Sequence, residues 1–293
     1  MSLAKSLDTF TLNRSWLNKK WVERKQARSE KKEVTPFDLD TYDGDDVEYD
    51  VKLEPLIEKT HKSWHKLLKS LDYKKIEERI SSDLAKTGTI VNMFPEKENI
   101  FRVFGMPLDN IKVVILGQDV YPNVDKKTDL PQAVGLCFSV PKEVDIPSSL
   151  KNIIKNLEKD PLIKFKKDKD TGGDISSWEK QGVFLLNCGL TCLEKRAGSH
   201  AKLWAPLTND IISHIAKNTE NVVFVLWGAF ALDKEKIILE SGKKHHVIKS
   251  SHPSGLSCNK PLKSYPAFKN CHFAGIVNKI LKEKEKKEIE WSF

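Results

Sequence analysis

The chain has no long hydrophobic segment. Its 293 residues contain no run that approaches the ~18 consecutive apolar residues needed to cross a membrane. The first ten residues, Met1 to Phe10, also lack the apolar core of a secretory signal. These absences argue against the membrane and secreted classes, and the sequence predicts an intracellular protein of the nucleus or cytoplasm with no membrane association.

Cysteine pairs and phosphate-binding motifs are also missing. The chain has an odd number of cysteines and no C-x-x-C pair, a pattern that predicts neither a disulfide framework nor a zinc site. The pattern G-x-x-x-x-G-K-S/T is absent, which argues against a doubly wound nucleotide-binding protein. We expect the adjacent His245 and His246 to be solvated or hydrogen-bonded at a strand start. The five cysteines are Cys137, Cys188, Cys192, Cys258 and Cys271.

Positive charge, in contrast, is abundant. The net charge is +8 at pH 7, a balance that favours a polyanionic partner, nucleic acid above all. A basic block at residues 1–35 precedes an acidic block at 36–50, and such opposed blocks are typical of mobile arms. We therefore predict a flexible extension over residues 1–50 and a folded domain over 51–293. In the alternative, a short helix within residues 1–35, with Trp16, Leu17, Trp21 and Val22 on its apolar side, docks a replication or repair protein or tethers DNA.

The rest of the chain alternates between strand-like and helix-like segments. Helical periodicity is expected first over Leu53–Leu71 and Tyr73–Leu84. Alternation of short apolar runs with helices implies βαβ units and a mainly parallel sheet, an α/β fold. The expected strands are Ile111–Leu116, Val183–Leu186, Val222–Trp227 and His246–Lys249, and the expected helices are Ser148–Lys159, Leu207–Lys217 and Ala229–Ser241.

Three polar residues follow strands of the expected sheet. Asp119, Asn187 and His252 each come shortly after a predicted strand. In open α/β sheets ligands bind beyond the carboxyl ends of the strands, so we expect these three side chains to converge. Taken singly, each has a structural explanation, such as a helix cap or a turn-closing residue. Their occurrence at three strand ends favours an active site, although spacing alone names no reaction.

Six segments, in order, resemble the motifs of the family-1 uracil-DNA glycosylases. The resemblance covers roughly residues 60–293 and implies a three-layer α/β/α fold with a central parallel four-stranded sheet. It also implies hydrolytic removal of uracil from single- or double-stranded DNA, the start of base-excision repair, by a monomer without metal or cofactor. The segments are Gly-Gln-Asp-Val-Tyr-Pro (117–122), Gly-Leu-Cys-Phe-Ser-Val (135–140), Ile-Pro-Ser-Ser-Leu (146–150), Gly-Val-Phe-Leu-Leu-Asn (182–187), Leu-Trp-Gly-Ala (226–229) and His-Pro-Ser-Gly-Leu-Ser (252–257).

The resemblance assigns a role to each motif residue. Asp119 faces the sugar and activates water, and His252 donates a hydrogen bond to the departing uracil. Among the base-binding residues, Phe138 stacks on the ring, Asn187 reads its polar edge, Tyr121 blocks the thymine methyl, and the Gln118 backbone helps to hold the base. Leu256 is expected to intercalate into the base stack. The remaining DNA contacts are assigned to Ser148, Ser149, Gly228, Ala229, Ser254 and Ser257.

The chain departs from the family pattern at four motif positions. Val120 and Gly255 stand where proline is usual, Pro122 replaces histidine, and Ala229 replaces serine. An insertion at about 125–130 also lengthens the catalytic loop. Some viral members carry proline at the position of Pro122, so a viral origin is one alternative. These departures leave open a second function, a glycosylase-like scaffold with weakened catalysis that binds DNA or a replication partner.

Overall fold

The computed structural model describes residues 51–86 and 93–293. The extension predicted over residues 1–50 therefore lies outside the described residues. The chain divides into two units, and each is considered by itself. The first includes helix α4 (Lys74–Lys86), which confirms the helical periodicity expected there. Within this unit the backbone N–H of Val51 donates to Ser81 Oγ over 3.3 Å.

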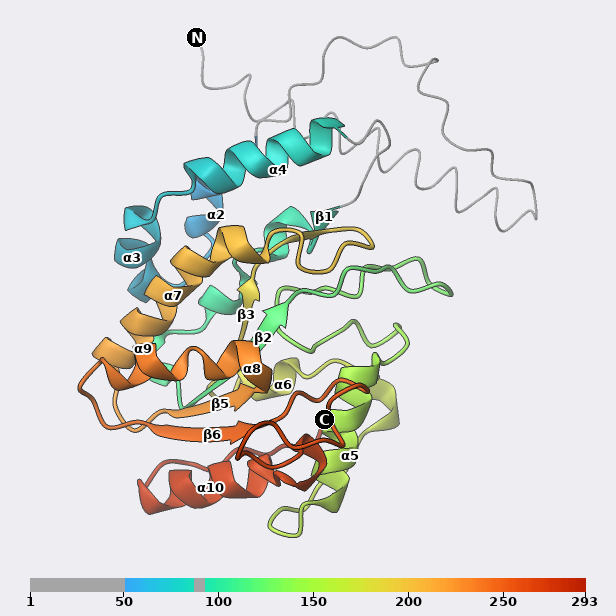
Figure 1. The fold of residues 1–293 in the computed structure, drawn as a ribbon, viewed down its shortest axis with the longest axis vertical. Helices are drawn as coiled ribbons and strands as arrows, with labels where there is room; N and C mark the ends of the chain where they lie inside the picture. Colours follow the sequence, from blue (N-terminus) through green and yellow to red (C-terminus); the bar gives the residue numbers. More distant parts are fainter. Residues whose placement is uncertain (1–50, 87–92) are drawn as a thin grey trace. The chain divides into compact units, whose positions relative to one another are not determined.

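The second unit contains a four-stranded parallel sheet with the order β3-β2-β5-β6 (Figure 1). Its strands are β2 (Val113–Asp119), β3 (Val183–Gly189), β5 (Val223–Trp227) and β6 (His246–Ser250). Near-continuous apolar runs are typical of parallel strands that are covered on both faces. The four strands expected from the sequence are confirmed. Their bounds differ from the expected ones, most clearly at the ends of β2 and β3. These two strands continue to Asp119 and Gly189, because the residues after Leu116 and Leu186 extend the pairing between them.

Helices cover both faces of the sheet, which gives the expected three-layer α/β/α architecture. In Figure 1, α7 and α9 lie on one side of the strands and α10 on the other. The helices of this unit are α2 (Glu54–Ile57), α3 (His65–Ser70), α5 (Ser148–Lys159), α6 (Ser176–Glu179), α7 (Ala201–Asn218), α8 (Gly228–Leu232), α9 (Glu235–Leu239) and α10 (Phe273–Glu283). Short 3-10 turns lie at 62–64, 97–99, 102–105, 108–110, 169–171 and 268–270. A separate antiparallel pair joins β1 (Met93–Phe94) to β4 (Cys192–Leu193).

Three helix predictions need correction. The segment from Leu53 to Leu71 is broken after α2, because Thr60 Oγ1 donates to the Ile57 carbonyl and His61 caps the next turn. The segment expected over 229–241 is two short helices, α8 and α9. Helix α7 begins six residues earlier than expected, because it accommodates Pro206 within its length. Helix α10 had no counterpart in the sequence-based prediction.

The core is rich in aromatic side chains. Trp227 at the end of β5 packs edge-on against Phe273 of α10, with ring centroids 4.9 Å apart, and against Phe268 at 5.1 Å. All five cysteines lie in the described part of the chain; they are buried and form no disulfide there. His245 Nε2 lies 2.8 Å from the Ala216 carbonyl, in line with the hydrogen-bonded histidine that was expected. In the described part, no helix has the length and apolar character needed to span a membrane.

Candidate active site at the carboxyl ends of the strands

The register between β2 and β3 brings two of the predicted residues together. Gly117 pairs with Asn187, and Asp119 pairs with Gly189, so each functional side chain stands beside a glycine of the neighbouring strand. A Cβ atom at Gly117 would overlap Asn187 Oδ1, and one at Gly189 would lie 2.6 Å from Asp119 Oδ1. Both glycines are therefore needed because the side chain across the strand occupies the space of their missing Cβ.

The Asp119 carboxyl group is largely buried, and only one of its two oxygens accepts a hydrogen bond from a described residue. Its Oδ2 accepts a hydrogen bond from the Gly198 N–H. Oδ1 is buried and has no hydrogen-bond partner among the residues that the structure describes. Burial raises the pKa of the carboxyl group to about 6, although the Gly198 and Val120 N–H groups oppose the shift. Asp119 is therefore mostly ionised at pH 7, yet basic enough to accept a proton from water.

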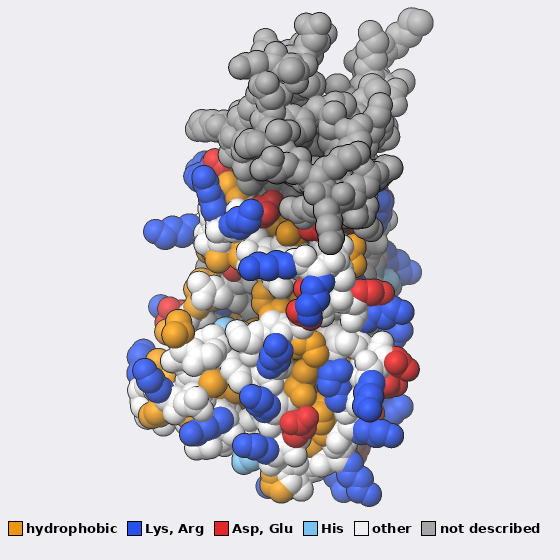
Figure 2. All heavy atoms as spheres, turned by 90° about the vertical axis from the view of Figure 1, so that its right-hand side faces the viewer, with side chains coloured by type: hydrophobic (Ala, Val, Ile, Leu, Met, Phe, Trp, Pro, Cys, Tyr) orange, Lys and Arg blue, Asp and Glu red, His pale blue; other side chains and the backbone are white. Residues whose placement is uncertain are grey.

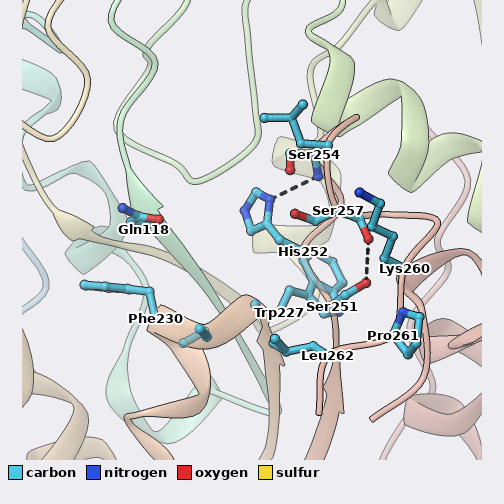
Figure 3. A pocket seen from close by; sticks show the side chains of 14 residues that line it. Gln118, Trp227, Phe230, Ser251, His252, Ser254, Ser257, Lys260, Pro261 and Leu262 are labelled. Carbon is cyan, nitrogen blue, oxygen red and sulfur yellow. Dashed lines mark hydrogen bonds between the residues drawn. The ribbon is translucent and has the colours of Figure 1, made fainter. Parts of the chain in front are cut away.

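His252 follows β6 and is oriented by its own loop. Its Nδ1 accepts a hydrogen bond from the Ser254 N–H over 3.0 Å (Figure 3). Because Nδ1 acts as the acceptor, the proton of the neutral ring lies on Nε2, which becomes a donor. Burial lowers the pKa of the imidazole, so the neutral form dominates at pH 7. Gly228 has φ +85° and leaves no room for a Cβ, which would lie 2.9 Å from His252 Cβ.

The Phe138 ring lies close both to the His252 ring and to Trp227 at the end of β5. Its ring centroid lies 6.0 Å from that of His252 and 5.5 Å from that of Trp227. Phe138 has φ +64°, a left-handed conformation that is unusual for an aromatic residue and indicates a backbone constrained by its surroundings. The preceding residue, Cys137, lies against Gly117, beside Asn187. Contacts thus connect Asn187 to His252 through the segment that carries Phe138.

Tyr121 lies on the other side of the catalytic loop. It packs against a buried cluster that includes Val120, Phe94 and Cys192. Burial raises the pKa of its hydroxyl group well above the usual range, so the side chain stays neutral. The hydroxyl is buried without a hydrogen-bond partner in the described part of the chain. Tyr121 can therefore act as a fixed apolar wall.

A cavity of about 680 Å³ opens beside these residues (Figure 3). Its lining includes Gln118 and His252, but Asp119, Tyr121, Phe138 and Asn187 are not part of it. The remaining lining comes from the end of β5, from α8 and from the segment around His252; it consists of Trp227, Gly228, Ala229, Phe230, Ala231, Ser251, Ser254, Leu256, Ser257, Lys260, Pro261 and Leu262. The cavity thus adjoins the predicted base-binding residues.

Comparison with known proteins identifies the family. The model of the uracil DNA glycosylase superfamily matches residues 104–279. The chain is 42% identical over 222 residues to the uracil-DNA glycosylase of Francisella tularensis subsp. holarctica, which covers 75% of this chain and 92% of that relative. The chain belongs to the uracil-DNA glycosylase superfamily.

Solved structures of this superfamily show the same fold. The crystal structure of mimivirus uracil-DNA glycosylase aligns with a TM-score of 0.73 and 33% identity, over 83% of this chain and 90% of that one. A variant of mimivirus UNG in complex with UGI aligns with a TM-score of 0.74 and 34% identity, over 83% and 92% of the two chains. The fold expected from the motifs is thus confirmed.

The residues that this glycosylase is predicted to use for DNA contacts lie around the cavity and at α5. Leu256 is 87% exposed, as expected for an intercalating side chain, and Gly255 beside it is exposed as well. Ser148 and Ser149 form the first turn of α5, where free N–H groups favour a phosphate. Figure 2 looks onto the side toward which β5 and β6 point, and there Lys and Arg side chains outnumber Asp and Glu.

The departures from the family motifs have local structural consequences. Val120 is buried in the cluster below Tyr121, and the Pro122 carbonyl accepts a hydrogen bond of 2.7 Å from the Lys195 N–H. The insertion folds into a closed turn between Val124 and Pro131, which form an isolated β-bridge. Asp125 organises this turn and holds it against the segment before α5.

Four hydrogen bonds define the role of Asp125 in that turn. One carboxylate oxygen accepts from the N–H groups of Lys127 and Thr128 and from the Thr128 hydroxyl. The other accepts from the Asp145 N–H over 3.1 Å. These hydrogen bonds, that from the Thr128 N–H above all, lower the pKa of Asp125 to about 2, so the group stays ionised at neutral pH. The lengthened catalytic loop is thereby attached to the segment that leads into Ser148.

Sequence reasoning missed Gly198, whose N–H is the donor to Asp119. The two residues are 79 positions apart, and a glycine in a turn gives no indication of a distant partner. The loop that presents Gly198 is held by the Ser199 hydroxyl, which accepts from the Leu193 N–H over 2.9 Å. Phe230, which lines the cavity, was also missed because an aromatic residue near the start of a helix is usually part of the core.

Proposed function

We propose that this chain excises uracil from DNA with Asp119 and His252 as its catalytic residues. As a member of the uracil-DNA glycosylase superfamily it is a monofunctional DNA N-glycosylase, which hydrolyses the bond between the base and the sugar. The bond breaks with positive charge developing on the sugar and negative charge on the departing uracil. A site for this reaction needs an anion near the sugar and a hydrogen-bond donor near the base.

Asp119 meets the first requirement. Its ionised carboxylate stabilises the developing positive charge, and its unused Oδ1 can accept a hydrogen bond from water. As the water attacks the sugar, Asp119 takes up one proton, and the electron pair of the broken bond leaves with the uracil. A positioned general base of this kind contributes ~10²–10⁴ in rate.

His252 meets the second requirement. Its Nε2–H is free to donate to the uracil O2, because Nδ1 already accepts from Ser254. A neutral donor placed where charge develops is worth ~10²–10³ in rate. The low pKa of the ring supports this role, since the histidine acts as a donor without prior protonation.

Base selection is assigned to the residues around the strand ends. The Asn187 amide can accept from uracil N3–H and donate to O4, a pattern that cytosine does not match. Tyr121 would fill the space of a thymine methyl group, and Phe138 would stack on the base. The backbone of Gln118 would hold the base from the end of β2.

DNA binding is assigned to the exposed loops around the cavity. Backbone amides and hydroxyl groups hold phosphates without reading sequence, a role suited to Ser148, Ser149, Gly228, Ala229, Ser254 and Ser257. We further propose that the enzyme is an intracellular monomer. We propose that residues 1–50 are an extension to a domain over 51–293 and that residues 1–35 attract DNA or dock a repair or replication protein.

The observation that carries this proposal is a cavity lined by both His252 and Gln118, the residue next to Asp119, together with pKa shifts of Asp119 and His252 that suit the two proposed roles. The test is release of free uracil from a uracil-containing single strand in the presence of EDTA. Release with formation of an abasic site supports the proposal, and the Asp119→Asn variant is the matched control. Retention of DNA without release would favour the non-catalytic scaffold instead.

A further inference from the structure

Phe230 lines the cavity but has no part in the chemistry described above. It lies two residues after Gly228, in α8, and its side chain is half-buried. In Figure 3, Phe230 and Gln118 lie to one side of His252, whereas Lys260 and Pro261 lie to the other. An aromatic ring thus lines the same cavity as His252, the residue proposed to contact the target base.

Lys234 holds this ring in place. Its Nζ lies over the Phe230 ring, 4.8 Å from the centroid, and donates to Asn209 Oδ1 of α7 over 2.8 Å. The Lys234 side chain is only 8% exposed. Burying an ammonium group is unfavourable unless it finds partners, and here the partners are an amide oxygen and the face of the ring. The orientation of Phe230 is thus set by contacts with α7 as well as by its own helix.

The cavity offers space for more than the target base. Its volume of about 680 Å³ lies within the range of pockets that hold drug-sized ligands, which are larger than one pyrimidine. The groups proposed to hold phosphates, those of Gly228, Ala229 and Ser254, line the same cavity. A strand that places its uracil near His252 and its phosphates on these groups would run along the cavity that Phe230 lines.

We propose that Phe230 is a stacking platform for the base of the nucleotide next to the target uridine in the same strand. This inference rests on the proposed function, and it adds a second base-binding subsite to the site. Every base has a flat face that can stack on an aromatic ring, so the subsite accepts all four bases. Lys234 acts as a positioning residue for the ring.

The test uses single-stranded pentanucleotides with one central uridine. Three substrates are compared: one with all bases present, and two in which a tetrahydrofuran residue replaces the nucleotide on the 5′ or the 3′ side. For the wild-type protein we expect removal of one neighbouring base, and not of the other, to lower kcat/KM. The expected loss is ~5–150-fold, the range for one base–aromatic stack. A stack made equally in the ground and transition states should appear in KM and leave kcat unchanged.

Three variants then assign this loss to Phe230. Phe230→Leu removes the ring and keeps an apolar side chain. On the complete substrate, its kcat/KM should fall by the factor that the wild type loses when the neighbouring base is removed. Removal of that base should then lower the kcat/KM of the variant no further. Phe230→Tyr keeps the ring and should behave like the wild type. Lys234→Met should reduce the effect of the neighbouring base without abolishing it. Equal losses by Phe230→Leu on all three substrates, or a wild type indifferent to both base removals, would overturn the proposal.

A binding measurement separates this inference from the proposed function. The same oligonucleotides, with 2′-fluoro-deoxyuridine at the centre to block cleavage, are titrated by fluorescence anisotropy. Non-additive effects of the base removal and Phe230→Leu on binding would support the stacking subsite even if no uracil were released. Additive effects would overturn the subsite while leaving uracil release by Asp119 and His252 intact.

Discussion

Substitution of Asp119 by asparagine removes the charge of the carboxylate but keeps its size. The Asn oxygen can still accept from the Gly198 N–H, so the loop around the site should keep its conformation. The variant cannot accept a proton from water or balance the positive charge on the sugar. We therefore expect uracil release to fall by ~10²–10⁴, the contribution of a positioned general base, with little change in DNA affinity.

The pH dependence gives a more specific test of the same residue. Only ionised Asp119 can act as a base, so activity should fall as the pH drops through its pKa. With that pKa at about 6, the ionised fraction is about 90% at pH 7 and about 10% at pH 5. We therefore expect the wild-type rate to fall about tenfold between pH 7 and pH 5, through one protonation.

Single-turnover release at saturating enzyme, measured from pH 5 to 9, should show this acidic limb. The acidic limb should be absent from Asp119→Asn, because the residual rate of this variant should not fall as the pH drops through about 6. His252 also titrates, but its pKa lies below the usual value, so His252→Leu should keep the limb that belongs to Asp119. A limb that persists near pH 6 in Asp119→Asn, or release at the wild-type rate, would refute the assigned role.

Four further predictions follow from the site. His252→Leu should reduce release by ~10²–10³ without loss of DNA binding, and wild-type release would contradict its role as donor. Asn187→Asp should gain some release of cytosine and Tyr121→Ala some release of thymine; loss of uracil release with no gain on either base would refute both assignments. Leu256→Ala should slow release most from a U·A pair, less from a U·G mismatch and least from a single strand, because extrusion of a paired base costs a few kcal/mol; equal losses would exclude a wedge. Asp125→Asn should destabilise the fold by ~1–2 kcal/mol in thermal unfolding, since one oxygen that accepts from a backbone N–H is lost, and an unchanged unfolding temperature would show that the hydrogen bonds of Asp125 are dispensable for stability.

The sequence predicted the strands that carry the candidate site better than it predicted the helices around them. Asp119 and Asn187 lie in the last residues of β2 and β3, and not after these strands as the sequence had suggested. Parallel strands end at one edge of a sheet, so the proximity of the two residues could still be inferred without coordinates. The helix near Leu53 was different, because a local hydrogen bond from Thr60 ends it despite continuous apolar periodicity. Hydrogen bonds from side chains such as Thr60 to nearby backbone groups can end a helix. The spacing of apolar residues does not indicate where such hydrogen bonds form.

The contacts that tune Asp119 could not be predicted, because they depend on distant residues. The Gly198 N–H reaches the carboxylate from a loop that follows β4, and nothing in its Ala-Gly-Ser context marks it as a donor. The insertion was visible as extra residues, but its attachment through Asp125 to the Asp145 N–H depends on two loops folding together. Local sequence can specify which groups are present, whereas their hydrogen bonds depend on the tertiary fold.

Burial acts in opposite directions on the two catalytic groups, and both directions favour the reaction. Loss of water disfavours a charge, so it raises the pKa of Asp119 and lowers that of His252. The Gly198 N–H opposes the shift of Asp119, which stays ionised at pH 7, while His252 keeps its proton on Nε2. In the proposed mechanism, the site therefore holds a negative charge on the sugar side and a neutral donor on the base side before the bond breaks. A substitution that admitted water would lower the pKa of Asp119 and at the same time raise the pKa of His252. Loss of either side chain would instead remove only the limb of the pH profile that belongs to that side chain. The pH profile therefore distinguishes added water from the loss of a catalytic group.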